Sequence, residues 1–292
     1  MSWFTFIMSS ALMLGLYDFN KKHALSNNRV MPVLFFSSLV GLVALTLVQL
    51  CTGHLAEYFL CGWKAWALVF LKALIVASSW TAGFYALHDL PISLAVPVLG
   101  TSPLGAAIGG VIFFGEYPSW VQVLGMFIVF FGLWRFTGIG QSEGFSWKGR
   151  NMLLLFSATL LASASGIYDR YLLKVLGLDV NLVQYQFYVS LCIILSCFWL
   201  AQPHVAFLRE QNPFQWKWSI FAIGICLLFT DWLYFCAVAD PAAQLGVLSV
   251  LRRTSVIFSF LCGAFYFHEK DIRTKAVALF IVLVGVFLLG IS

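Results

Sequence analysis

Long stretches without charged side chains divide the chain into apolar segments. Seven stretches contain no Asp, Glu, Lys or Arg, and three further apolar stretches are each interrupted by one or two charges. A helix that crosses the hydrocarbon core of a bilayer needs about 20 predominantly apolar residues. The pattern therefore predicts ten membrane-spanning helices, over residues 3–19, 30–50, 66–87, 92–114, 119–139, 151–174, 181–200, 217–238, 243–267 and 274–291.

The composition of the chain supports this prediction. Apolar residues make up 61% of its 292 residues and charged residues only 10%, whereas a soluble domain carries roughly 25% charged residues. This balance excludes a typical soluble enzyme, a nucleic-acid-binding module and a disordered chain. We expect an all-α, multi-pass membrane protein of the plasma (cytoplasmic) membrane, in contact with membrane lipid.

Three short motifs of the first half return in the second half. In order along the chain, residues 15–18 return at 166–169, residues 101–102 at 254–255 and residues 114–116 at 267–269. The offsets are nearly constant, and an odd number of spans in each copy turns the second copy upside down in the bilayer. We therefore expect two inverted five-helix repeats, residues 1–140 and 151–292, an architecture typical of secondary transporters.

The end of each half carries a further common pattern. A Glu-containing link precedes a glycine-bearing last helix, within Leu94–Trp134 and within Leu245–Leu289. In this pattern the chain resembles EamA-type carriers of the drug/metabolite transporter superfamily. The resemblance implies two EamA-like repeats and a carrier, not an enzyme, that moves a small metabolite by alternating access. It leaves the substrate open among amino acids, sugars, sugar phosphates, nucleotide sugars and drugs.

Two adjacent arginines lie at the middle of the predicted ninth helix. A charge at this depth costs roughly 2.5–3.5 kcal/mol on insertion scales, so it predicts a functional site. Arg252 and Arg253 point about 100° apart. We expect one of them to bind an anionic or zwitterionic substrate and the other to pair with Asp231 of the eighth helix. The alternative is an internal Arg–Asp pair that only fixes helix packing.

The repeated motifs supply two more carboxylates, each late in the first helix of its half. Inversion puts Asp18 and Asp169 near opposite membrane faces. With the preceding Tyr17 and Tyr168, they are predicted to act as gates or as proton-coupling sites. The alternative is a pair of helix-end carboxylates bonded to nearby backbone or basic side chains. Asp231 is a third candidate for proton coupling.

A pair of hydroxyl side chains is also repeated, in the fourth and ninth helices. Thr101 and Ser102 correspond to Thr254 and Ser255. Pro97 and a second proline interrupt the hydrogen-bond ladder of the fourth helix. Irregular backbone at membrane depth is tolerated where it lines a cavity or is buried in protein. We therefore expect the four hydroxyl residues to line the substrate cavity, with simple helix packing as the alternative.

Several remaining residues are expected to have structural roles. Lys72 lies near the start of the third predicted helix, so its side chain is expected to extend to the membrane interface. Glu116 and Glu269 lie in links, where they are expected to cap or pair. Gly105 and Gly109 have the spacing that permits close helix approach, and we expect them to pack inside the protein.

The basic residues give a prediction of orientation. The links after the odd-numbered helices carry eleven Lys and Arg, and the opposite links carry three. Because basic residues favour cytoplasmic loops, the count predicts that both termini lie outside. The family resemblance implies the reverse, with cytoplasmic termini.

No cofactor is expected. The cysteines and histidines form no metal-binding pattern, and no phosphate-binding glycine-rich loop is present. The expected partner is a small-molecule substrate, coupled to protons or to a counter-substrate, with no nucleic acid and the oligomeric state open. The alternatives are a membrane binding or scaffold protein without transport, and an intramembrane aspartyl protease. Inversion disfavours the protease, because a catalytic dyad needs its carboxylates within a few ångströms of each other.

Overall fold

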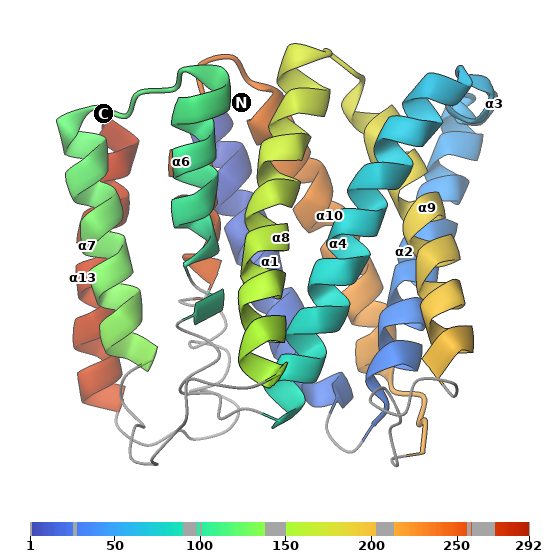
Figure 1. The fold of residues 1–292 in the computed structure, drawn as a ribbon, viewed down its shortest axis with the longest axis horizontal. Helices are drawn as coiled ribbons and strands as arrows, with labels where there is room; N and C mark the ends of the chain where they lie inside the picture. Colours follow the sequence, from blue (N-terminus) through green and yellow to red (C-terminus); the bar gives the residue numbers. More distant parts are fainter. Residues whose placement is uncertain are drawn as a thin grey trace.

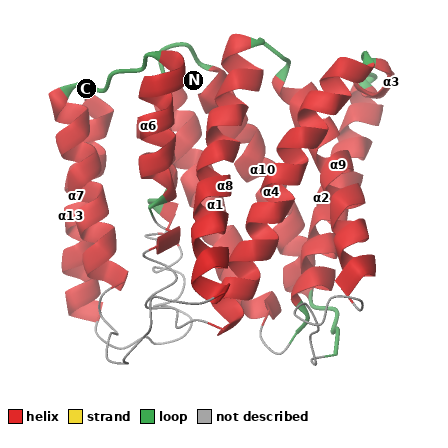
Figure 2. Ribbon diagram, in the orientation of Figure 1, coloured by secondary structure: helices red, strands yellow, loops and turns green. Residues whose placement is uncertain are grey.

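The computed structural model is a bundle of helices that run roughly parallel to one another (Figure 1). It describes residues 2–25, 28–89, 98–99, 101–137, 150–202, 213–255, 258 and 272–291. Within these residues every regular element is helical and no strand occurs (Figure 2). The expected all-α class is therefore confirmed.

The described helices fall into the two halves of the chain. The first half contains α1 (Trp3–Leu25), α2 (Val30–Thr52), α3 (Leu55–Leu60), α4 (Trp63–Asp89), α6 (Ser102–Phe114) and α7 (Trp120–Thr137). The second half contains α8 (Arg150–Arg170) with the π-helix η1 (Tyr171–Val175), α9 (Val180–Ala201), α10 (Trp218–Ala239), α11 (Leu245–Arg252) and α13 (Ile272–Ile291).

Five of the described stretches are long and apolar enough to cross a membrane. They are Val30–Thr52, Trp63–Gly83, Met152–Val175, Val180–Ala201 and Trp218–Ala239. Shorter apolar helices cover Ser102–Phe114, Trp120–Gly132 and Phe280–Leu289. The chain is thus an integral, multi-pass membrane protein.

Most predicted spans coincide with a described helix. The largest difference at a shared boundary is in α1, which continues to Leu25 because helical geometry persists beyond the apolar segment into polar residues. The short helix α3 was not predicted. The predicted spans 92–114 and 243–267 are only partly described, by α6 and α11.

The chain direction reverses between the first helices of the two halves. α1 begins at the end of the bundle where α8 finishes, so the two helices run in opposite directions (Figure 1). The two chain ends lie at the same end of the bundle. This end also holds α3 and the link between α6 and α7.

Glycines set the closest approaches between helices. A Cβ atom added to Gly105 of α6 would lie 2.8 Å from the Cβ of Ser163 in α8, and Gly109 also faces α8. The expected internal packing of this glycine pair is confirmed. At the crossing of α7 and α13, a Cβ on Gly125 would lie 3.2 Å from the Gly285 carbonyl oxygen, and the reverse distance is 2.9 Å.

Candidate functional site

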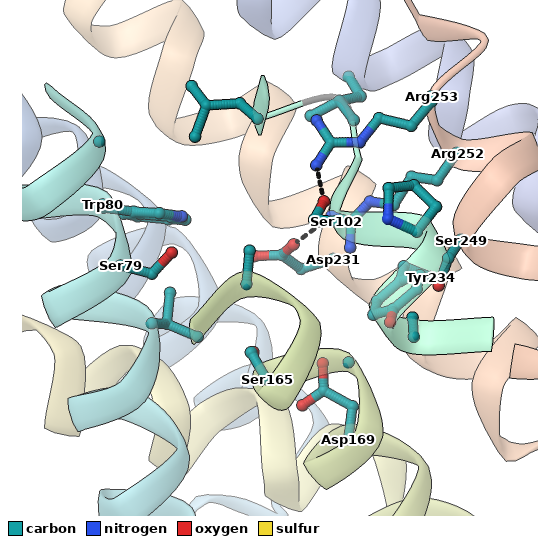
Figure 3. Close-up of a pocket in the computed structure, with 18 of the residues that line it drawn as sticks. Ser79, Trp80, Ser102, Ser165, Asp169, Asp231, Tyr234, Ser249, Arg252 and Arg253 are labelled. Carbon is teal, nitrogen blue, oxygen red and sulfur yellow. Dashed lines mark hydrogen bonds and ion pairs between the residues drawn. The ribbon is translucent and has the colours of Figure 1, made fainter. Parts of the chain in front are cut away.

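A cavity of about 330 Å³ lies inside the bundle and is lined by both halves of the chain (Figure 3). α1, α4 and α6 contribute from the first half, and α8, α9, α10 and α11 from the second. The polar and charged residues among the lining are Tyr17, Lys21, Lys72, Ser79, Ser102, Ser165, Asp169, Asp231, Tyr234, Ser249, Arg252 and Arg253. A charged cavity between helices is the kind of place where ligands bind in helical bundles.

One of the two adjacent arginines is held in an ion pair. Arg252 Nη2 lies 3.0 Å from Asp231 Oδ1, and its guanidinium carbon lies 4.0 Å from the centre of the Tyr234 ring. The Tyr188 hydroxyl lies 3.5 Å from the second oxygen of Asp231. The predicted pairing of one arginine with Asp231 is therefore confirmed.

The second arginine has a neutral partner. Arg253 Nη2 donates to Ser102 Oγ (Figure 3), and the Ser102 carbonyl accepts a hydrogen bond of 2.8 Å from Ser163. Among the described residues, no carboxylate lies within ion-pair distance of Arg253. α11 ends at Arg252, so both cations are also close to the partial negative charge of a helix C-terminus. Arg253 therefore presents a charge that an anionic ligand can neutralise.

A second buried ion pair lines the cavity. Lys72 Nζ lies 2.5 Å from Asp169 Oδ1, and the two side chains are 2% and 5% exposed. The expectation that Lys72 extends to the membrane interface was wrong. α4 begins at Trp63, three residues before the predicted span, so Lys72 lies about 13 Å into the helix at a rise of about 1.5 Å per residue.

A third ionic group, the Glu116 cluster, joins the two halves at one end of the bundle. Glu116 Oε1 accepts hydrogen bonds from Arg170 Nε and Nη2 at 2.9 and 2.7 Å and from Lys174 Nζ at 2.9 Å. Glu116 Oε2 accepts one from the Leu245 N–H at 2.7 Å, at the start of α11, where a negative charge is favourable. The expected pairing of Glu116 is confirmed.

The environment of Glu116 alters its acidity. Burial raises the pKa of this carboxyl group, but the hydrogen bonds from Leu245, Lys174 and Arg170 outweigh burial and hold the pKa below its usual value. Arg170 itself is fully buried and also donates to one backbone carbonyl at the end of α10 and to two in the link between α10 and α11. The cluster therefore fixes this link against the first half of the chain.

Other predicted site residues lie away from the cavity lining. Thr101 is exposed, whereas Thr254 and Ser255 are buried. Asp18 is half-buried next to the lining residue Tyr17. The Tyr168 hydroxyl donates to a backbone carbonyl of α4. Their roles in binding or gating stay predictions.

Sequence reasoning missed two cations of the cavity, Lys21 and Lys72. Lys72 carried the same signal as the arginines, a charge inside an apolar span. Lys21 lies beyond the apolar segment of α1, where nothing in the sequence distinguishes it from a loop lysine. Pro97 and Glu269 lie outside the described residues. Within the part of the chain that the structure describes, no group of three or more His, Cys, Asp or Glu side chains is arranged to hold a metal ion.

The fold and the cavity define a class, that of multi-pass helical membrane proteins with a charged internal cavity. Residues 1–137 match the model of the EamA-like transporter family. This match confirms the expected resemblance to EamA-type carriers of the drug/metabolite transporter superfamily.

The chain is similar to a solved structure titled "Crystal structure of protein", with a TM-score of 0.74 and 16% sequence identity. The similarity covers 98% of this chain and 95% of the other, and at this identity it shows the fold alone. A comparison with curated proteins gives no match.

Proposed function

We propose that this protein is a secondary carrier that moves a small anionic or zwitterionic metabolite across the plasma membrane by alternating access. In this proposal the two halves, residues 1–140 and 151–292, are inverted five-helix repeats that close alternately around the cavity. The opposite directions of α1 and α8 and the motif repeated at 15–18 and 166–169 support it. Inverted repeats with a site between them are the usual architecture for this mechanism.

The observation that carries the proposal is the charge of the cavity. Four basic side chains and two carboxylates line it. Both carboxylates already form ion pairs, with Lys72 and with Arg252. Arg253 has instead a hydroxyl group as its hydrogen-bond partner. A guanidinium can form two parallel hydrogen bonds with a carboxylate or phosphate group. Arg253 and Ser102 are therefore proposed as the direct substrate contacts.

The remaining site residues have supporting roles in the proposed cycle. Arg252 and Asp231 hold one side of the cavity, and Tyr17 closes part of it from α1. Asp18 and Asp169, with Tyr168 beside Asp169, are proposed to act in gating or in coupling to protons or a counter-substrate. The other repeated hydroxyls, Thr101, Thr254 and Ser255, are proposed to support the helices around Arg253.

The two alternative functions account for fewer observations. A scaffold protein has no need for a cavity lined by six charged side chains. A protease of the aspartyl type needs two carboxylates that share one proton, whereas Asp169 and Asp231 are each held in an ion pair with a cation from another helix. A carrier uses the cavity and both ion pairs.

A ligand-stabilisation screen tests the proposal. Purified protein is heated with amino acids, organic acids and sugar phosphates, because a ligand that binds the folded state raises the melting temperature. We expect at least one anionic compound to stabilise the wild type and not Arg253→Ala, and Lys64→Ala, which removes a charge at the exposed start of α4, to respond like the wild type. Equal stabilisation of R253A, or no stabilising compound in the whole panel, contradicts the anion site.

Uptake into vesicles separates transport from binding. A stabilising compound in radiolabelled form is supplied to vesicles that contain the wild type, R253A or K64A. Wild type and K64A are expected to take it up and R253A to do so at least ten-fold more slowly. Binding without uptake in the wild type would favour the scaffold alternative.

A further inference from the structure

The ion pair of Lys72 and Asp169 differs from the other pair in the cavity in how each carboxylate is held. Asp231 has two partners, Arg252 and the Tyr188 hydroxyl. Asp169 is bound, among the described residues, by Lys72 alone. An isolated carboxylate buried away from water is strongly disfavoured and takes up a proton instead. The charge of Asp169 therefore depends on a single cation.

Two aromatic rings hold the ammonium group of Lys72 in place independently of Asp169. Its ammonium nitrogen lies 4.3 Å from the centre of the Phe187 ring and 4.6 Å from that of Phe235. Aromatic faces at these distances attract a cation, and more strongly when it is removed from water. Both rings and Lys72 belong to the cavity lining, so an anion in the cavity can reach the same ammonium group.

The other charged and titratable groups near Asp169 come from two helices. Asp231 and Tyr234 face it from α10, and Arg252 faces it from α11. Arg170, the next residue in α8, is directed to Glu116. None of these takes the place of Lys72, because Arg252 is bound to Asp231.

We infer that Lys72 is the residue that keeps Asp169 ionised, and that this pair is the place where the carrier couples an anion to a proton. An anion that binds Lys72 releases Asp169, and Asp169 then takes one proton from the water on the side to which the cavity is open. When the anion leaves, the ammonium group of Lys72 pairs with Asp169 again and the proton is released. The inference rests on the proposed function and selects Asp169 over Asp18 and Asp231.

Infrared spectroscopy of the purified protein in lipid nanodiscs tests this dependence. The carbonyl stretch of a protonated carboxyl group is distinct from that of a carboxylate. At neutral pH we expect Lys72→Met to show the band of one additional protonated carboxyl per chain, absent from the wild type and from the double variant K72M/D169N. Lys72→Arg, which keeps a cation, is expected to lack the band.

The outcomes separate this inference from the proposed function, since the infrared band needs no substrate. A K72M protein without the additional band, or a band that persists in K72M/D169N, overturns it. Lys64→Met, on the exposed first turn of the same helix, is the matched control and is expected to match the wild type. Size-exclusion profiles check that each variant is folded. If K72M alone does not fold, acid titration of the wild type is compared with that of D169N. An acid-induced carboxyl band that is missing from D169N supports the inference, and an identical band in both proteins overturns it.

Discussion

Glu116 and Arg170 form a two-point contact that joins the halves of the protein. Two guanidinium nitrogens of Arg170 lie 2.9 and 2.7 Å from one carboxylate oxygen of Glu116, and both side chains are almost completely buried. The residues lie 54 positions apart in the chain. This contact ties the link between α6 and α7 to the end of α8, so it holds the two halves together at this end of the bundle.

Acid is expected to weaken this contact and, with it, the fold. The pKa of Glu116 is held below its usual value of 4.5, so its contribution to stability is complete above pH 4.5. It is lost as the pH falls through the lower folded-state pKa. As the pH falls below 4.5, the melting temperature of the wild type is expected to decrease more steeply than that of Glu116→Gln. At neutral pH the Glu116→Gln variant is expected to have the lower melting temperature of the two.

Glu57 provides the control for this experiment. It lies in α3 with an exposed side chain, so Glu57→Gln is expected to follow the wild-type curve. Parallel curves for the wild type and E116Q would show that the cluster contributes no pH-dependent stability.

Removal of one partner from the Arg252–Asp231 pair is expected to be costly. Asp231→Ala leaves a mostly buried guanidinium without its carboxylate, and breaking a buried pair costs about 3–5 kcal/mol. We expect a loss of about 3 kcal/mol, near the lower end, because Arg252 is 24% exposed. Chemical denaturation measures this loss in the free energy of unfolding. The double variant D231L/R252M, which removes both charges, is expected to recover most of the loss; no recovery would contradict the ion-pair account.

The crossing of α7 and α13 tolerates no added methyl group. A Cβ on Gly285 would lie 2.9 Å from both the backbone nitrogen of Val129 and the carbonyl oxygen of Gly125, whereas a Cβ on Gly125 meets its nearest neighbour at 3.0 Å. Overpacking typically costs about 1–3 kcal/mol. Gly285→Ala is therefore expected to lower the melting temperature more than Gly125→Ala.

Gly62 offers a matched control for these substitutions. A Cβ there would meet nothing within 4 Å, so Gly62→Ala is expected to leave the melting temperature unchanged. A Gly285→Ala variant as stable as Gly62→Ala would mean that the two helices separate easily.

The orientation of the chain is predicted from its basic residues. The links after the odd-numbered predicted spans carry most of the basic residues, which favours the cytoplasm for those links and the outside for both termini. A reporter fused to the C-terminus that is active only outside the cytoplasm is therefore expected to be active. A fluorescent protein that folds only in the cytoplasm and is bright at the same position would reverse the assignment.

The sequence was sufficient for the membrane class and most helix positions, because lipid demands long apolar segments. It also pointed to Arg252 and Asp231, since both are charges inside such segments at similar depth. It was insufficient for Lys72, because the apolar pattern starts the helix three residues late and so places the lysine close to the membrane interface. The partners of Glu116 lie 54 to 129 residues away, and local patterns carry no information about such distant contacts.

The first half of the chain carries no basic residue at the position that corresponds to Arg170 of the Glu116 cluster. The motif offset of 151 residues relates Arg170 to Phe19, whose side chain is uncharged. In the proposed cycle, opening the Glu116 end breaks four hydrogen bonds to one carboxylate, and the first-half position that corresponds to Arg170 carries no guanidinium. The two half-reactions of a turnover are therefore expected to have unequal barriers, with departure from the Glu116-closed state as the slow step.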